Sequence, residues 1–232
     1  NSSMQNEAIY KELEAAMKRN PEKTRQWYEK AQLVRKMSDS LYMFAEDLKW
    51  EIVRDVDGDD ADLENIEGRD NLEAATHVML APGVGKGDDL KRAIESYRDG
   101  ITQMINDKQQ KEIIQSNLTT EVPKKAKMMG KNWQEYMFEN TPVAAAVTLL
   151  TKLQTDVRYA EGEMLHQLVA NIDVKDVRVN QINAYVIPNS QTVVRGGKFS
   201  AQIIMAAVDS TQRPEIYVGN TSLKSANGRY ET

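Results

Sequence analysis

The sequence has no cysteine and only two histidines among its 232 residues. Without cysteine, the chain can form no disulfide bond, no cysteine-ligated zinc site and no thiol nucleophile. His166 is the only histidine besides His77, so neither has the histidine and cysteine co-ligands that a zinc site of this type requires. We therefore interpret His77 as a packing or surface residue and expect no metal centre.

Long hydrophobic runs are also missing. No stretch approaches 18 consecutive apolar residues, so we expect no segment of this chain to span a membrane. The sequence shows no signal-like segment, and it starts at Asn1 in what already resembles the approach to a helix. We therefore expect an upstream segment to precede Asn1 in a longer protein.

The chain has no excess of positive charge. Its formal net charge is −5 and its isoelectric point is about 5.3, which argues against nucleic-acid binding through phosphate contacts. Hydrophobic residues make up 41% of the sequence. A chain of this length and composition can form one large domain or two smaller ones, each with its own core.

Catalytic motifs are absent, and a possible phosphate loop is incomplete. There is no G-x-S-x-G and no H-E-x-x-H. The segment PGVGKG, Pro82–Gly87, has Leu80 where a phosphate loop needs its first glycine and Gly87 where it needs serine or threonine. We interpret it as a flexible loop between helices. We expect a non-enzymatic protein with no cofactor, and the sequence assigns no catalytic or partner-binding residue.

The segment DVDGDDAD, Asp55–Asp62, has the alternating aspartates of a calcium loop. An EF-hand requires glycine at its sixth position and glutamate at its twelfth, where this sequence has Asp60 and Ile66. We interpret the segment as a solvated loop that ends a helix. Most other acidic residues fall on the polar faces of expected helices, where solvated surface is the ordinary explanation.

The apolar residues in the first part of the chain recur at helical spacing. We expect a helix over Met4–Lys18 and a longer one over Pro21–Val53. The longer helix carries a heptad-like stripe of Trp27, Ala31, Val34, Ser38, Leu41, Ala45, Leu48 and Ile52. A coiled coil would also show this spacing. Met37 and Phe44 widen the stripe and favour an antiparallel helical bundle.

Further helical segments follow. We expect a short helix capped by Asp70 that runs to Leu80, and a helix capped by Asp88 that extends to about Leu118. The connection Thr119–Asn132 contains four lysines, which we interpret as solvated. Trp133–Phe138 reads as an aromatic turn that seals one end of the bundle.

The segment Thr141–Ala170 separates helical from β-rich sequence. Thr141 is the expected N-cap, and Pro142 fits the first helical position. One face of the expected helix carries Ala146, Leu149, Leu150, Leu153, Val157, Ala160, Met164 and Leu168. Gly162 is a mild cost, about 1 kcal/mol relative to alanine.

From Ile172 the hydrophobic period changes toward that of strands. Strand candidates cover Asn183–Ile187, Lys198–Val208 and Glu215–Val218. Gly196-Gly197 and Asn227-Gly228 are hairpin signals. An immunoglobulin-like sandwich needs more strands than the roughly five visible. We therefore predict an α + β multidomain chain: an antiparallel helical bundle over 1–171 and an incomplete all-β immunoglobulin-like sandwich over 172–232, with unpaired edges.

The joint between the two predicted domains lacks flexible residues. No glycine or proline occurs between Leu168 and Ile187. Flexible linkers are usually rich in glycine and serine, so we expect a stiff joint.

Two stretches resemble a known family. FENTPVAAAVTLLTKLQTDVRYAEGEML, Phe138–Leu165, is similar to the periplasmic part of the GldM/PorM family, and AYVIPNSQTVVRGGKFSAQIIMAAVDSTQRPEIYV, Ala184–Val218, is similar to its first β domain. This family provides the inner-membrane motor proteins of the type IX secretion system and of bacterial gliding. The order of a helical bundle followed by β domains also agrees, and the resemblance covers essentially the whole chain.

The resemblance implies a role in a machine. It implies a homodimeric periplasmic shaft, anchored to the inner membrane by a transmembrane helix that sits in a proton-channel motor subunit. It also implies distal β domains that reach ring proteins at the outer membrane. This chain contains neither the transmembrane helix nor the distal domains, so no proton-coupling residue is assigned. An alternative is an extracytoplasmic sensory helical bundle that binds a small ligand, although such a bundle needs no appended β domain.

Overall fold

The computed structural model describes residues 2–175, 184–188, 201–205, 217–218, 221–222, 224–226 and 229–231. Side-chain burial is described up to residue 172. The chain divides into two compact units, Asn1–Asp176 and Val177–Thr232.

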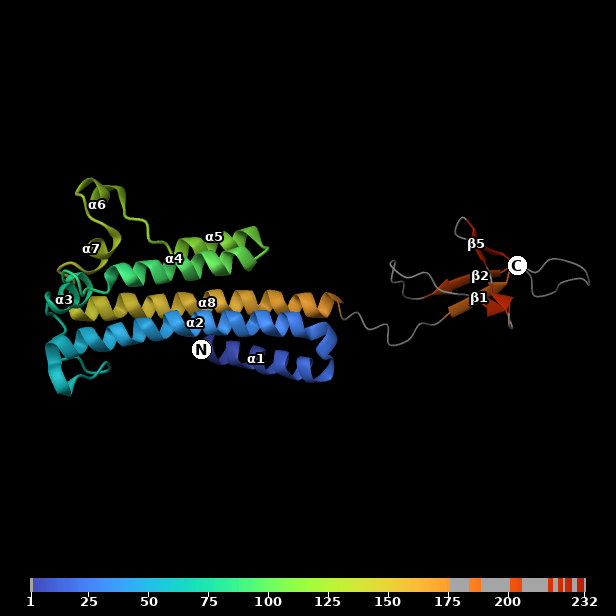
Figure 1. Ribbon diagram of the computed structural model, residues 1–232, viewed down its shortest axis with the longest axis horizontal. Coiled ribbons are helices and arrows are strands. Elements are labelled where there is room, and N and C mark those ends of the chain that lie inside the picture. Colours follow the sequence, from blue (N-terminus) through green and yellow to red (C-terminus); the bar gives the residue numbers. More distant parts are fainter. Residues whose placement is uncertain are drawn as a thin grey trace, which may run out of the picture. The chain divides into compact units, whose positions relative to one another are not determined.

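The first unit is a bundle of helices (Figure 1). Its elements are α1 (Ser2–Arg19), α2 (Pro21–Asp57), the short 3-10 helix η1 (Gly58–Asp60), α3 (Ala74–Leu80), α4 (Gly87–Met104), α5 (Lys108–Asn117), α6 (Lys124–Met128), α7 (Trp133–Phe138) and α8 (Val143–Lys175). Figure 1 shows α2 and α8 side by side, with α1 along α2 and the pair α4–α5 on the other side of α8. Contacts of Arg158 with Asp39 and of Gln154 with Tyr42 show that α8 runs antiparallel to α2. The predicted helical bundle is confirmed.

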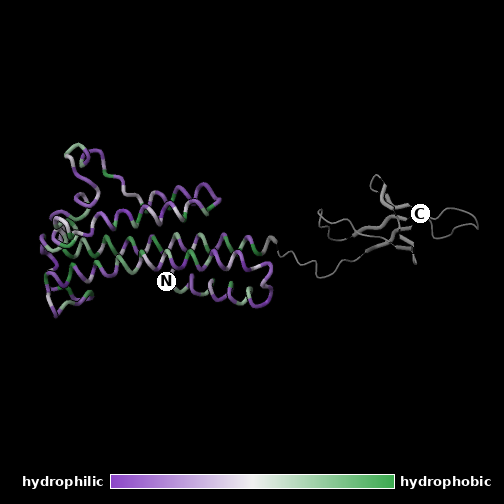
Figure 2. The backbone as a smooth tube through the Cα atoms, in the orientation of Figure 1, coloured by the Kyte–Doolittle hydropathy of each residue, from purple (hydrophilic) through white to green (hydrophobic). Residues whose placement is uncertain are grey.

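Helix α2 starts and packs as its sequence predicts. Asn20 accepts a hydrogen bond from the backbone N–H of Lys23, and Pro21 occupies the first turn. Along the long helices, hydrophobic and hydrophilic residues alternate with the helical repeat (Figure 2). All but one residue of the predicted stripe are buried, namely Ala31, Val34, Ser38, Leu41, Ala45, Leu48 and Ile52. The exception is Trp27, which is half-buried.

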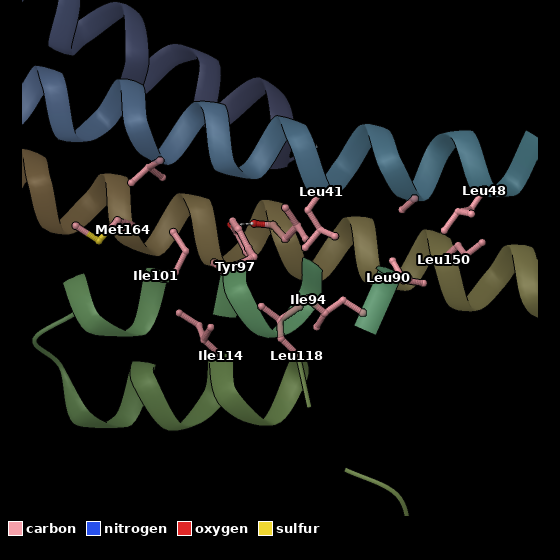
Figure 3. Packing of buried hydrophobic residues seen from close by; sticks show 14 of the residues in the cluster. Leu41, Leu48, Leu90, Ile94, Tyr97, Ile101, Ile114, Leu118, Leu150 and Met164 are labelled. Atoms are coloured by element: carbon pink, nitrogen blue, oxygen red, sulfur yellow. Dashed lines mark hydrogen bonds between the residues drawn. The ribbon is translucent and has the colours of Figure 1, made fainter. Parts of the chain in front are cut away.

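The core lies mainly between α2, α4, α5 and α8 (Figure 3), and α1, α3 and α7 add further buried residues to it. Its largest fully buried side chains include Leu48 and Ile52 of α2, Leu90 and Ile101 of α4, Ile114 of α5, and Leu150, Met164 and Leu165 of α8. Burial of apolar surface is the main force that holds such a bundle together, at roughly 25 cal/mol per Å².

Helix α8 begins later than predicted. The hydroxyl of Thr141 donates to the carbonyl oxygen of Met137 and caps nothing. The first N–H groups of α8 are instead satisfied by a neighbouring loop: Val143 donates to the carbonyl of Asn71, and Ala144 donates to that of Arg69. The prediction of Thr141 as N-cap is therefore wrong, because a tertiary contact supplies the cap.

The two aspartates predicted as caps do not cap. Helix α3 begins at Ala74, and the side chain of Asn71 accepts hydrogen bonds from the N–H groups of Glu73 and Ala74. Asp70 makes neither of these bonds. Helix α4 begins at Gly87, so Asp88 lies inside its first turn, where a negative charge is favourable near the helix N-terminus.

The single helix predicted over 88–118 is two helices. Helix α4 ends at Met104 and α5 begins at Lys108, with Asp107 accepting a hydrogen bond from the N–H of Gln110. The bond from Arg98 to the carbonyl of Leu118 shows that α5 folds back along α4. Helix α6 lies inside the predicted connection Thr119–Asn132.

One end of the bundle is closed by α3 and α7. Trp133 and Phe138 of α7 are buried, and their rings meet edge to face with centroids 6.0 Å apart. Asn132 and Glu135 form a reciprocal capping box at the start of α7. The aromatic segment thus packs at the bundle end as predicted.

In the second unit the structure describes three antiparallel strand pairs. These are β1 (Ala184–Pro188) with β2 (Ala201–Met205), β3 (Tyr217–Val218) with β4 (Thr221–Ser222), and β5 (Lys224–Ala226) with β6 (Arg229–Glu231). Strands β1, β2 and β3 overlap the predicted candidates, whereas β4, β5 and β6 lie outside them, with β5 and β6 on either side of Asn227-Gly228. The hairpin signal Gly196-Gly197 and the joint at 176–183 lie outside the described residues. The immunoglobulin-like sandwich stays a prediction.

The change of period at Ile172 does not end the helix. Helix α8 continues to Lys175, so IDVK is helical. Among the described residues, no helix is both long and apolar enough to cross a membrane.

Candidate functional site

Polar side chains lie inside the bundle at positions where an apolar residue is expected. Asn6, Ser38, Gln154 and Glu161 are each at most 5% exposed. Glu161 follows Val157 by four residues and precedes Met164 by three, so the helical repeat places it on the core face of α8. Burying such groups costs free energy unless they are hydrogen-bonded, so their partners decide what they do.

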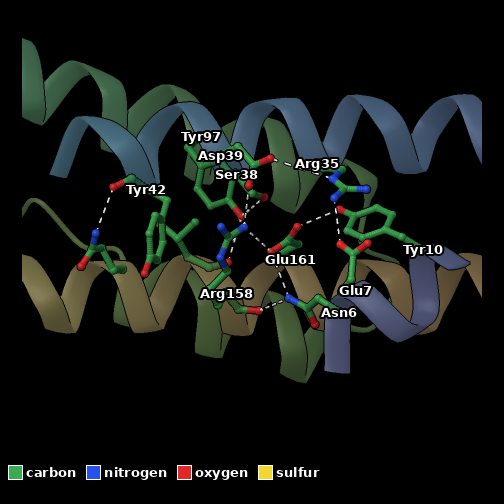
Figure 4. Close-up of polar contacts among 12 residues, drawn as sticks. Asn6, Glu7, Tyr10, Arg35, Ser38, Asp39, Tyr42, Tyr97, Arg158 and Glu161 are labelled. Atoms are coloured by element: carbon green, nitrogen blue, oxygen red, sulfur yellow. Dashed lines mark hydrogen bonds and ion pairs between the residues drawn. The ribbon is translucent and has the colours of Figure 1, made fainter. Parts of the chain in front are cut away.

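Glu161 is the most deeply buried charged residue among those described, with 1% exposure. It accepts three hydrogen bonds, from Nδ2 of Asn6 at 2.9 Å, from Oη of Tyr10 at 2.7 Å and from Nη1 of Arg158 at 2.9 Å (Figure 4). Two of these donors belong to α1 and the third to α8. The carboxylate therefore fixes α1 against α8 at one point along their length.

Arg158 extends this arrangement to α2. Its Nη1 also donates to Oδ1 of Asp39 at 2.8 Å, and its guanidinium lies 4.3 Å from the ring centroid of Tyr42. Burial alone would lower the pKa of Arg158, but the hydrogen bonds and charges of Glu161 and Asp39 raise it above the ordinary value. The guanidinium therefore stays charged and joins α8 to α2.

A second arginine links α1 and α2 beside the first. Nη2 of Arg35 donates to Oε2 of Glu7 at 2.8 Å, and the guanidinium of Arg35 lies 4.7 Å from the ring centroid of Tyr10. Arg35 also approaches Asp39 at 4.0 Å. Asp39 of α2 therefore lies between Arg35, which bonds to α1, and Arg158, which belongs to α8.

Tyr97 brings α4 into the same set of contacts. Its hydroxyl donates to the carbonyl oxygen of Val157 at 3.1 Å and accepts from Oγ of Ser38 at 2.9 Å. Burial, together with the charge of Glu161, raises the pKa of Tyr97 well above its ordinary value, and the same two causes raise that of Tyr10. Both phenols therefore remain protonated donors. We call the set Asn6, Glu7, Tyr10, Arg35, Ser38, Asp39, Tyr42, Tyr97, Arg158 and Glu161 the central polar network.

A smaller group, the Lys49 cluster, joins α2 and α8 farther along. It consists of Glu46, Lys49, Thr151 and Gln154. Nζ of Lys49 lies 2.7 Å from both Oε1 of Gln154 and Oε2 of Glu46. Burial raises the pKa of Glu46, but the hydrogen bonds from Lys49 and Gln154 and the charge of Lys49 lower it more, so the net shift is downward.

The segments considered for ligand binding have structural roles. Asp57 is the last residue of α2 and accepts hydrogen bonds from the N–H groups of Glu67 and Gly68, so the chain after η1 folds back onto the end of α2. His77 is exposed and lies 2.8 Å from Asp55. Within the described residues, no group of three or more histidine, cysteine, aspartate or glutamate side chains is placed to hold a metal ion.

The predicted flexible loop Pro82–Gly87 is a tight turn. Gly85 donates to the carbonyl of Ala81 at 2.7 Å, and a Cβ at Gly85 would lie 2.7 Å from the carbonyl oxygen of Met79. Lys86 pairs with Glu51 of α2. Gly85 and Gly87 therefore allow close packing at this turn, and Lys86 is bonded within the fold.

Sequence reasoning missed the central polar network. The sequence analysis assigns no buried role to Glu161 or Gln154, although each follows an apolar residue of α8, Val157 or Leu150, by four positions and so lies on the apolar face. A polar residue at a core position of a helix was the signal that could have found them. Ser38 was included in the stripe of α2, but its bond to Tyr97 was not foreseen.

The comparisons with known proteins agree with this architecture. The family model described as GldM N-terminal domain matches residues 1–171, and the one described as GldM second domain matches residues 173–232. No curated protein matches the chain. The two matches together cover nearly all of the sequence, in the order that the family resemblance predicts. The chain therefore belongs to the GldM family, a component of the gliding and type IX secretion motor.

Proposed function

We propose that this chain is the proximal part of a periplasmic shaft, which transmits motion driven by the proton gradient from an inner-membrane motor toward the outer membrane. The chain acts mechanically and catalyses no reaction. The observation that carries the proposal is α8, a continuous helix of 33 residues, about 50 Å long at about 1.5 Å per residue. It begins at the closed end of the bundle and ends at Lys175, three residues into the sequence of the second matched domain.

The cross-links of α8 to its neighbours support a force-bearing role. The central polar network bonds α8 to α1, α2 and α4, and the Lys49 cluster bonds it again to α2. Sliding α8 past α2 by one turn would separate these partners inside the bundle. An unpaired buried charge costs several kcal/mol, so the network opposes slippage more strongly than an apolar interface, which can repack.

The remaining parts of the proposal concern the assembly. We propose that two copies form a homodimeric shaft and that residues 172–232 form an immunoglobulin-like sandwich. A transmembrane helix outside this chain would engage the proton-channel subunit, and distal domains would reach the outer-membrane ring. The family assignment supports this arrangement. We propose that motion passes between the two units through the joint between Leu168 and Ile187, which the sequence predicts to be stiff.

An insertion at the end of α8 tests transmission through the joint. About eleven Gly-Ser residues after Lys175, in the full-length protein, leave both units intact but make the joint flexible. We expect secretion of type IX cargo and gliding to be lost while the protein accumulates normally. A helical alanine-rich insertion of about eleven residues adds about three turns and serves as the stiff control. Unchanged secretion with the flexible insertion would refute transmission by a rigid joint.

A further inference from the structure

Helix α6 and the residues beside it form an exposed surface that the shaft role does not use. The segment 122–131, VPKKAKMMGK, has four lysines and no acidic residue in a chain whose net charge is −5. Met128 is 81% exposed, Met129 68% and Tyr136 45%. We call the set Lys124, Lys125, Lys127, Met128, Met129, Lys131 and Tyr136 the lysine–methionine surface.

These lysines differ from most of those elsewhere in the bundle. Lys131 pairs with Glu139 at 2.7 Å, but Lys124, Lys125 and Lys127 have no ion pair within the part of the chain that the structure describes. Ala126 is the only buried residue of α6, so the rest of the helix faces outward. The surface thus combines uncompensated positive charge with exposed apolar side chains.

The shape and position of this surface restrict what it can contact. Figure 1 shows α6 standing outside α4 and α7, at the end of the bundle where α8 begins. A shallow depression of about 430 Å³, lined by Pro123, Lys125, Ala126, Met129, Lys131 and Tyr136, adjoins the exposed methionines. The acidic segment Asp55–Asp62 lies at the same end but well away from α6 in this view. Among the described residues, Lys131 is therefore the one lysine of this surface that an ion pair neutralises.

We propose that the lysine–methionine surface binds the headgroup region of an anionic phospholipid bilayer. Lysines near an anionic membrane are attracted at its surface, and flexible methionine side chains can enter the boundary between headgroups and acyl chains. Tyrosine is favoured at the same depth because its ring is apolar and its hydroxyl is polar. An acidic protein partner would satisfy the lysines but would leave the exposed methionines without a role.

The position of α6 at one end of the bundle agrees with the proposed shaft function, and this part of the lipid proposal rests on that function. If α8 leads away from the inner membrane, its starting end faces that membrane, and α6 lies at that end. The contact would support the bundle on the bilayer from the side. The vesicle experiment uses purified protein alone, so its failure would leave the shaft proposal standing.

Co-sedimentation with vesicles tests the proposal on the 232-residue chain. We expect binding to phosphatidylcholine vesicles that contain about 30% phosphatidylglycerol, little binding to phosphatidylcholine alone, and loss of binding at about 0.5 M salt. Replacing Lys124, Lys125 and Lys127 by serine should weaken binding about 100-fold, at about fivefold for each lysine. The pair Met128→Ser and Met129→Ser should weaken it by about tenfold.

A matched variant carries the same charge change elsewhere. Lys11, Lys30 and Lys36 are exposed on α1 and α2 and have no ion pair among the described residues, and replacing them by serine should reduce binding far less. Equal loss in both triple variants would show general electrostatic attraction and overturn the proposal, as would absence of binding by the unchanged chain. If the α6 variant instead changes the mass of the protein in solution without vesicles, the surface contacts a second copy and the lipid proposal is wrong. All variants alter exposed residues, so unchanged helical melting serves as the folding control.

Discussion

A single buried carboxylate shows how this bundle uses polar residues. Glu161 would be costly in an apolar core, but three donors from two helices satisfy it. One of these donors, Arg158, is held in turn by Asp39. Removing any one partner leaves other buried groups unpaired. A substitution in the network should therefore cost more free energy of unfolding than its hydrogen bonds contribute net.

Replacing Glu161 by alanine should destabilise the helical unit by about 3–5 kcal/mol, because Arg158 and Tyr10 lose their buried acceptor. Urea unfolding followed by the helical signal in far-ultraviolet circular dichroism measures this change. Glu163→Ala, two residues along the same helix on its more exposed side, is the control and should cost less than about 0.5 kcal/mol. Similar effects of the two substitutions would show that burial of Glu161 has no special importance.

The Lys49 cluster should make stability depend on pH. Because the pKa of Glu46 is lower in the folded chain than its ordinary value of 4.5, its ionised form stabilises the fold at neutral pH. That contribution is lost as the pH falls below about 4.5 and through the folded-state pKa. Glu46→Gln cannot titrate, so its melting temperature should lie below that of the unchanged chain at neutral pH and approach it in acid. A difference that stays constant with pH would contradict this assignment.

At the residue scale, sequence patterns found the apolar positions better than the polar ones. The stripe from Ala31 to Ile52 could be predicted because each member repeats at helical spacing, and burial follows from that spacing. The partners of Glu161 could not, because Asn6 and Tyr10 lie more than 150 residues away and only the tertiary fold brings them together. The sequence indicates that the four lysines of Thr119–Asn132 are solvated, but it does not predict the exposure of Met128 and Met129.

At the scale of the element, α1 and α8 meet at a glycine. A Cβ at Gly162 would lie 2.8 Å from Oδ1 of Asn6, closer than such atoms can approach. Gly162 therefore provides the space in which Asn6 reaches Glu161 and the carbonyl of Arg158. From helix propensity alone, this glycine is a mild cost to the helix. The structure shows that α8 needs it, because a larger side chain would collide with Asn6.

Gly162→Ala should for this reason reverse the usual effect of the substitution. In an exposed helix interior the change gains about 1 kcal/mol, but here it should cost about 1–2 kcal/mol by displacing Asn6. In an Asn6→Ala background the same substitution should regain about 1 kcal/mol, which a double-mutant cycle of urea unfolding measures. Gly100→Ala is the control, since a Cβ there meets only the mobile terminal methyl of Met37. Additive effects at Gly162 and Asn6 would show that the two do not interact.

The ends of elements were the least predictable features of the fold. Apolar residues recur after α4 at Ile113, Ile114 and Leu118, and no glycine or proline separates them from Met104, so the sequence indicates one long helix. The break is instead fixed by Gln167 of α8, which donates to the carbonyl of Met104 and accepts from the N–H of Asn106, both at 2.7 Å. The start of α8 is likewise satisfied by carbonyls from a distant loop. Helix ends capped by tertiary contacts leave little trace in the local sequence.

At the scale of the whole molecule, the helical unit contains a core of its own. Its buried cluster extends from Tyr10 in α1 to Leu168 in α8, and the central polar network is complete within the same unit. The family matches also meet between residues 171 and 173, close to the division between the compact units at 176. These observations indicate that the bundle draws its stability from within itself.

A fragment of residues 1–176 should therefore fold alone. We expect its helical signal to melt cooperatively within about 3 °C of the helical transition in the 232-residue chain, because it retains the buried residues and polar partners described for the bundle. A fragment ending at residue 150 is the control: it lacks Val157, Arg158 and Glu161, exposes the core faces of α2 and α4, and should not fold. If the 1–176 fragment aggregated or melted more than about 10 °C lower, the second unit would be part of the bundle's fold, and motion could not pass between two independently stable bodies.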